Sequence, residues 1–159
     1  MFLKSLVKLI VIIILCLATG WLGSLFTRQS IPNWYADLQK PAFNPPDWVF
    51  APVWTILYLM MAVGVFIILS KGLHNPNVRI ALVVFLAQLL LNGLWTPIFF
   101  GAHLIFAALV EIIILWLSII LTIVLFWKIS IPASLLLLPY ILWVTFAVVL
   151  NAAIWLLNR

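Results

Sequence analysis

Hydrophobic residues in this chain form five long runs separated by mostly short polar connections. The runs cover about residues 6–26, 49–70, 78–100, 104–127 and 132–157. Each run can cross a hydrocarbon core of about 30 Å as a helix that rises about 1.5 Å per residue. A closed β-barrel would need stretches of about ten residues that alternate apolar and polar, and residues 111–123 show no such period. The pattern therefore predicts an all-α fold, a bundle of five transmembrane helices.

The connections predict how these helices are arranged. Only a few residues, about 101–103 and 128–131, separate the last three runs, so these helices must form antiparallel hairpins. Residues 27–48 form a much longer connection, rich in aromatic residues and proline, which is unlike the composition of a disordered linker. Loops of this length are usually functional or disordered. We therefore expect an ordered lid over one end of the bundle.

Composition supports the membrane assignment and limits the domain count to one. Hydrophobic residues make up 68% of the chain and charged residues 7%, too few to cover a water-soluble surface. Five spans use most of the 159 residues, so we expect residues 1–159 to form a single domain. The first run resembles a signal peptide, but it is longer than a signal's apolar region and no A-x-A-like site closes it. We expect it to be retained as the first helix.

Basic residues are scattered singly between the apolar runs, which argues against nucleic-acid binding despite a formal charge of +5. Lysine and arginine residues near span ends favour the cytoplasmic side. Five lie on the amino-terminal side and three on the other: Lys4, Lys8, Lys71, Arg79 and Lys128 against Arg28, Lys40 and Arg159. We expect the amino terminus inside, and the lid and carboxyl terminus outside; in a bacterium the membrane would be the cell membrane.

Two spans carry polar residues that should face protein. Glu111 is the only acidic residue in any span, and Ser118 and Thr122 follow on the same helix face. An intramembrane carboxyl usually marks a functional position, although a hydrogen bond to a neighbouring helix would also explain it. In the third run one stripe mixes amides with aromatic residues: Gln88, Asn92, Trp95 and Phe99. Such a stripe is typical of a ligand pocket, or of hydrogen bonding between helices.

The chain contains nine tryptophans. Those near span ends fit the aromatic belt at the membrane surface: Trp21, Trp34, Trp48, Trp127 and Trp155. Trp54, Trp95 and Trp143 lie deeper, with Tyr58 four residues after the first and Ala147 four after the last. These residues indicate a flat, aromatic-lined cavity with a small-residue floor. Packing between helices would also explain them.

Several kinds of chemistry have no support in the sequence. There is no phosphate-binding glycine loop, no H-E-x-x-H metal motif and no nucleophile beside a base. His74 and His103 stand alone in loops, and Cys16 is the only cysteine. We therefore predict neither a metal site nor a covalently bound cofactor.

Four segments resemble the tryptophan-rich sensory proteins and translocator proteins, the TspO/MBR family once called peripheral benzodiazepine receptors. They are W-Y-A-D-L-Q-K-P at 34–41, P-P-D-W-V-F-A-P-V-W-T-I-L-Y at 45–58, L-N-G-L-W-T-P-I-F-F-G-A at 91–102 and L-P-Y-I-L-W-V-T-F-A-V-V-L-N at 138–151. The resemblance covers nearly the whole chain. It implies a five-helix bundle, often a homodimer, with a pocket under the first loop for porphyrins, haem-like tetrapyrroles, sterols and synthetic ligands.

The resemblance also implies which residues form that pocket. They are Tyr35, Pro45, Trp54, Asn92, Trp95, Trp143 and Ala147. We add Tyr58 from its spacing to Trp54, and Glu111 because the family usually has an acidic residue on the fourth helix. The sterol motif proposed for the family needs a tyrosine that residues 151–155 lack, so cholesterol binding through that motif is not expected.

Three functions fit these observations. The first is an integral membrane receptor or sensor that binds porphyrins and related flat hydrophobic ligands. The second is light-dependent or oxidative degradation of porphyrin, in which Trp54 and Trp143 would act as catalytic electron donors. The third is a tetrapyrrole or sterol transporter, which the sequence supports least because it shows no inverted repeat. Loss of the porphyrin's Soret absorbance under light would distinguish the second from the first.

Overall fold

The computed structural model describes residues 2–159, apart from the side chains of Phe2 and Lys4. No described residue lies in a strand, and the all-α prediction is confirmed. The elements in chain order are α1 (Phe2–Ser30), α2 (Trp34–Asp37), the 3-10 turn η1 (Asp47–Val49), α3 (Phe50–Leu69), α4 (Pro76–Thr96), the wide helical turn η2 (Pro97–Gly101), α5 (Ile105–Trp127), α6 (Ile131–Leu135) and α7 (Leu138–Leu157).

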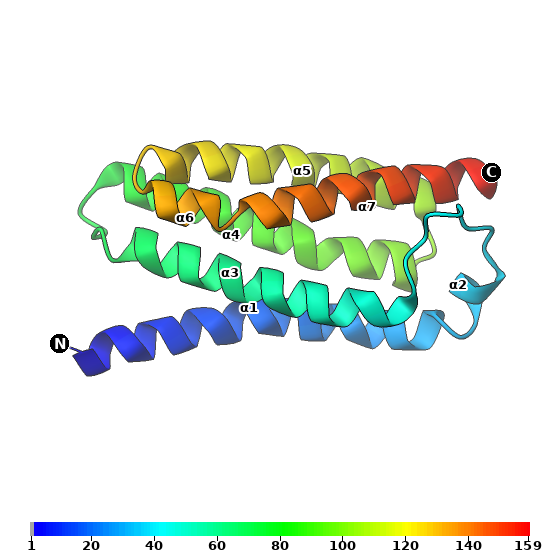
Figure 1. Ribbon diagram of the computed structural model, residues 1–159, viewed down its shortest axis with the longest axis horizontal. Helices are drawn as coiled ribbons and strands as arrows, with labels where there is room; N and C mark the ends of the chain where they lie inside the picture. Colours follow the sequence, from blue (N-terminus) through cyan, green and yellow to red (C-terminus); the bar gives the residue numbers. More distant parts are fainter. Residues whose placement is uncertain (1) are drawn as a thin grey trace.

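Five helical stretches are long and apolar enough to cross a membrane, as predicted. Successive spans run in opposite directions: α1, α4 and α7 point one way, and α3 and α5 point the other (Figure 1). The connection between α1 and α3 lies at the same end as the carboxyl terminus, and the amino terminus lies at the opposite end. We call these the lid end and the far end. Large apolar side chains cover the outer surface, as a lipid-facing surface requires.

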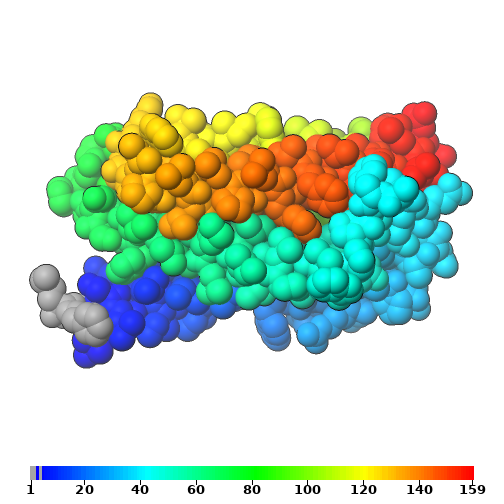
Figure 2. Space-filling view, viewed as in Figure 1, coloured from blue at the N-terminus to red at the C-terminus, as the bar shows by residue number. Residues whose placement is uncertain are grey.

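The helices close into a ring with one weak seam. α1 packs against α3 and α4, α4 against α5, and α5 against α7. α6 joins α5 to α3 and so completes the ring at the far end, but α7 makes only sparse contact with α3. Figure 2 shows this seam between α7, in orange, and α3, in bluish green. The bundle is therefore least tightly closed between α3 and α7, toward the lid end.

Three predicted boundaries need correction. The first helix continues to Ser30 rather than ending near residue 26. The third span leaves regular α-helix at Pro97, where the turn widens and the Ala102 amide donates to the Pro97 carbonyl. The last span, predicted as one helix over 132–157, is divided into α6 and α7. Pro139 explains the division, because it has no N–H to donate to the carbonyl four residues earlier.

Residues 31–46 form the lid, which is shorter than the predicted connection because α1 extends into it. The lid contains α2, and η1 leads from it into α3. Tyr35 anchors its inner side among buried residues that include Phe99, Ala108, Leu150 and Ile154. In Figure 2 the lid, in cyan, covers the right-hand end of the seam between α3 and α7. The lid is thus placed to close one end of any site along that seam.

Candidate ligand-binding site

The polar stripe of α4 faces the bundle interior, as predicted, and its amides bind other helices. Gln88 and Asn92 are buried. The Tyr58 hydroxyl of α3 donates to Asn92 Oδ1 at 2.5 Å, and Asn92 Nδ2 donates to the Tyr140 hydroxyl of α7 at 3.0 Å. Tyr140 in turn donates to Gln88 Oε1 at 2.9 Å. This network supports the interhelical explanation of the stripe, and Tyr140 is a member that spacing alone did not identify.

The three deep tryptophans lie in three different surroundings. Trp54 lies beside this network, with its ring centroid 5.6 Å from that of Tyr58 and 6.2 Å from that of Tyr140. Trp95 stacks on Phe99, with centroids 4.9 Å apart, and donates its indole N–H to Asn151. Trp143 lies apart from both, at the seam between α3 and α7. The three tryptophans therefore do not share one cavity wall, and Trp143 lines the open groove described next.

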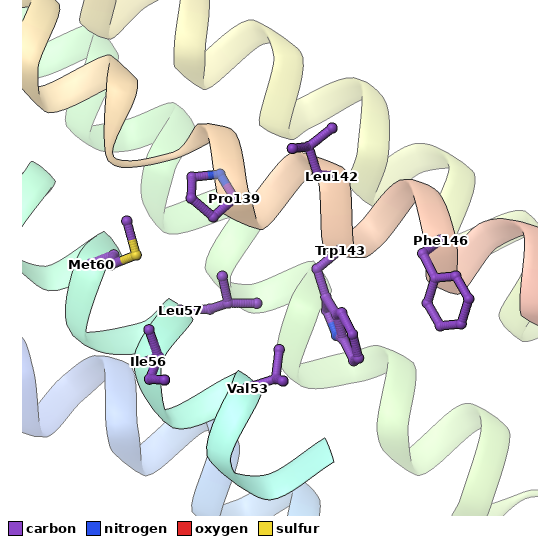
Figure 3. Close-up of a pocket in the computed structure, with 8 residues that line it drawn as sticks. All are labelled: Val53, Ile56, Leu57, Met60, Pro139, Leu142, Trp143 and Phe146. Carbon is purple, nitrogen blue, oxygen red and sulfur yellow. The ribbon is translucent and has the colours of Figure 1, made fainter. Parts of the chain in front are cut away.

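That space is an apolar groove of about 430 Å³ along the seam. Figure 3 shows α3 side chains along one side and α7 side chains along the other, with the Trp143 ring directed toward α3. The lining residues are Val53, Ile56, Leu57 and Met60 from α3, and Pro139, Leu142, Trp143 and Phe146 from α7. Ile56 is 57% exposed and Leu142 is 70% exposed, so the groove opens on the lipid-facing surface.

Aromatic rings connect the groove to the lid. Phe50, at the start of α3, contacts Trp143 with centroids 6.1 Å apart, and Trp143 contacts Phe146 at 5.5 Å. Phe43 of the lid contacts Phe146 at 6.3 Å. Ala147, the expected small-residue floor, is half-buried and packs against the main core rather than lining the groove. The lid end of the groove is therefore closed by aromatic side chains.

The lid holds a second, polar pocket of about 460 Å³ that includes two of the expected ligand residues, Tyr35 and Pro45. The buried Tyr35 hydroxyl donates to Asn44 Oδ1 at 3.0 Å. Lys40 lies over the Tyr35 ring, with Nζ 4.5 Å from its centroid, and donates to the backbone carbonyls of Ala36 and Leu38. This pocket offers the Lys40 ammonium next to an aromatic wall, and the Asp47 carboxylate lines it as well.

Burial keeps the Tyr35 phenol neutral. Desolvation, aided by the negative charge of Asp47, raises the pKa of Tyr35 from 10.0 to about 12. The hydroxyl therefore remains a hydrogen-bond donor throughout the physiological pH range.

Glu111 is buried, with 8% of its surface exposed, and neither carboxyl oxygen has a hydrogen-bond partner among the described residues. Ser118 and Thr122 do not serve it, because their hydroxyls donate to carbonyls of their own helix. The hypothesis that a hydrogen bond to a neighbouring helix explains this carboxyl is therefore wrong. Glu111 also lines neither of the two pockets.

The structure adds a contact between two residues at the lid end. Trp34 stacks on His103, with ring centroids 4.2 Å apart and planes inclined by 13°. His103 is exposed in its turn, as expected, and the Ser30 hydroxyl beside it donates to the Phe100 carbonyl. These contacts join the end of α1 and the start of α2 to the segment before α5. Sequence offered no sign of them, because the partners are far apart along the chain.

Comparison with known proteins agrees with this architecture. The sequence profile described as the TspO/MBR family matches residues 12–156. The chain is 46% identical to the tryptophan-rich protein TspO of Chlorobaculum tepidum, over 98% of both chains. It is also 46% identical to the tryptophan-rich protein TspO of Archaeoglobus fulgidus, over 97% of this chain and 99% of that one. The chain belongs to the TspO/MBR family.

The translocator protein of Bos taurus is a more distant TspO/MBR relative, 37% identical over 88% of this chain and 83% of its own. The resemblance found in four sequence segments is therefore confirmed over nearly the whole chain. Together with the five apolar spans, it establishes a multi-pass integral membrane protein of the TspO/MBR family.

Proposed function

We propose that this protein is a membrane receptor that binds porphyrins and related flat amphipathic molecules, with their apolar part in the groove between α3 and α7. The groove itself carries the proposal. It is lined only by apolar and aromatic side chains, and the lid that closes its end adds a polar pocket with Lys40. A mostly apolar space with a few placed polar groups is the usual form of a small-molecule site.

The chemistry of a porphyrin matches the combination of an apolar groove and a polar lid pocket. Its macrocycle is flat and apolar, and can stack on the Trp143 ring, while carboxylates on one edge can meet the Lys40 ammonium. Stacking of a flat ring on an aromatic side chain is worth about 1–3 kcal/mol per contact in nucleic-acid complexes. Asn92 and Tyr58, also expected to contact the ligand, hydrogen-bond to each other and line neither of the two pockets.

Equilibrium titration of the purified protein with protoporphyrin, haem and cholesterol in darkness tests this proposal. Trp143→Ala removes the stacking surface, so protoporphyrin affinity should fall about tenfold to a hundredfold, at about 1.4 kcal/mol per decade. Trp127→Ala is the matched control, because Trp127 is exposed at the far end of α5. Equal affinity of both variants for protoporphyrin would show that the groove is not the site.

Light-dependent porphyrin degradation is a second candidate, because an oxidisable indole, that of Trp143, forms part of the groove wall. Under this hypothesis, bound protoporphyrin should lose its Soret absorbance under light and yield a new product. If bound protoporphyrin loses no more Soret absorbance under light than free protoporphyrin does, the degradation hypothesis is rejected and only the receptor function remains.

We further propose that the lid and carboxyl terminus lie outside the cytoplasm and, in a bacterium, that the protein resides in the cell membrane. The bias in basic residues supports this orientation: Lys8, Lys71, Arg79 and Lys128 lie at the far end, against Arg28, Lys40 and Arg159 at the lid end. A reporter fused after Arg159 should be active on the outer side of the membrane. A reporter active only in the cytoplasm would reverse the orientation.

A further inference from the structure

The water-facing end of the site is fastened by hydrogen bonds. The Gln39 amide donates to Asn158 Oδ1 at 3.0 Å, and Asn158 Nδ2 donates to the Gln39 carbonyl at 2.9 Å. The Asn158 side chain, just beyond α7, thus binds both backbone groups of one lid residue. Contacts between Ser30 and Phe100 and between Trp34 and His103 fasten the start of the lid separately. Opening the lid toward water must therefore break paired polar contacts.

The residues that line the groove have no comparable fastening, and the hydrogen bonds that link α3 to α7 run through Asn92 of α4. All eight lining residues of the groove are apolar or aromatic, and the contacts across its lid end are ring contacts such as that of Phe50 with Trp143. Lipid tails are as apolar as these side chains, so exchanging protein contacts for lipid contacts there costs little free energy. α7 already makes only sparse contact with α3. The seam is therefore the easier of the two sides to open.

We propose that the ligand reaches the site sideways from the lipid, between α3 and α7, while the lid stays fastened. Trp143 and Phe146 lie on the route and act as its gate (Figure 3). This inference rests on the proposed function and narrows its ligand class. A ligand that follows this route dissolves in the membrane and carries its carboxylates on one edge, near the surface. A porphyrin with carboxylates around its whole rim is excluded, because the groove offers no partner for them.

Blocking each side separately tests the route. Leu142→Trp and Ile56→Trp add bulk at the exposed rim of the groove, and Val83→Trp adds the same bulk at an exposed position of α4 outside it. For the lid, Gln39→Cys and Asn158→Cys are joined by a short bis-maleimide, and the unlinked double variant is the control. The native Cys16 is fully buried and should not react. Protein in vesicles is mixed with protoporphyrin-loaded vesicles, and quenching of tryptophan fluorescence gives the transfer rates.

The two rim variants should slow association and dissociation of protoporphyrin together, by tenfold or more, because an obstructed route affects both directions. Val83→Trp and the linked lid variant should keep the parent's rates within about twofold. Circular dichroism and thermal unfolding show whether each variant is folded. If one rim variant does not fold, the other is sufficient for the test. A porphyrin carrying carboxylates around its rim should not associate with the parent from vesicles.

Other outcomes would overturn the lateral route. Loss of association on linking the lid, with unchanged rates in the rim variants, would mean that protoporphyrin enters from water beneath the lid. Rim variants that lose a co-purified phospholipid but keep the parent's protoporphyrin rates would mean that the groove holds a lipid chain. In both cases the parent still binds protoporphyrin, so the receptor function stands, but in the second case the groove is not the porphyrin site. Failure of the parent to bind protoporphyrin would instead reject the proposed function itself.

Discussion

The two ends of the bundle are built differently. At the far end, α6 fills the gap between α3 and α5, and Phe85 stacks on Phe126 with centroids 6.1 Å apart. Small residues allow close approach there: a Cβ added to Gly64 of α3 would lie 3.1 Å from the Ala133 carbonyl oxygen of α6. At the lid end, α7 departs from α3 and leaves the groove. Between α3 and α7, the far end is therefore closed by α6, whereas the lid end stays open and forms the groove.

Gly64→Leu should cause the largest loss of stability, because it adds bulk where α3 and α6 touch. Overpacking usually costs about 1–3 kcal/mol, and we expect the upper part of this range since the obstacle is backbone rather than a movable side chain. Thermal unfolding in detergent measures the effect. The neighbouring Val63 is partly exposed on the outer surface, so Val63→Leu is the control and should be nearly neutral. Equal stability of the two variants would contradict the division between the two ends.

The interior polar positions should respond in opposite directions. Asn92→Leu removes the partner of the Tyr58 hydroxyl and one partner of Tyr140, and should destabilise the protein by about 1–2 kcal/mol. Glu111→Leu removes a carboxyl that has no hydrogen bond, so the free energy of unfolding should stay the same or rise. Unfolding in detergent measures both changes. A Glu111→Leu variant that fails to insert or unfolds would show that this carboxyl supports the fold.

Sequence predicted the number and type of helices because a lipid environment demands long apolar runs, and these are visible without tertiary information. It did not predict the division of the last span, since the leucines at 135–138 form one hydropathic run although Pro139 interrupts the backbone bonding. The end of α1 was also missed. Thr27, Arg28 and Gln29 are polar but compatible with a helix, so hydropathy ends before the helix does.

For the candidate site, the sequence could predict only which residues share the inward-facing side of a helix. Spacing placed Gln88 and Asn92 on one inward face, which the structure confirms, but it could not name their partner Tyr140 on another helix. Nor could it show that Trp95 pairs with Asn151, whereas Trp143 lines a groove. Partners of this kind depend on how far each helix is shifted and rotated against the next. That information is held in the whole packed bundle rather than in any one segment.

Replacing Trp54 or Trp143 by Phe should lower protoporphyrin affinity less than removing the aromatic ring does. Each keeps an aromatic side chain, so protoporphyrin affinity should fall tenfold or less, about 1.4 kcal/mol. Trp143→Phe should have the larger effect, because only Trp143 lines the groove. Titration in darkness measures affinity, and Soret absorbance under light measures degradation. If both variants degrade porphyrin as the parent does, the tryptophans are not its electron donors.

The smallest expected effect concerns Tyr35 in the lid pocket, whose phenol should titrate only at a pH above the physiological range. The folded-state pKa of Tyr35 lies near 12, above its ordinary value of 10.0, so its contribution to lid stability is complete below about pH 10. That contribution is lost as the pH rises through about 12. The ring-carbon NMR signal of Tyr35, assigned by its absence from Tyr35→Phe, should titrate with this midpoint. Asp47→Asn should lower the midpoint only in part, because burial is the larger cause of the shift. A midpoint near 10 in the parent would mean that water reaches the phenol and that the lid is not closed at this end.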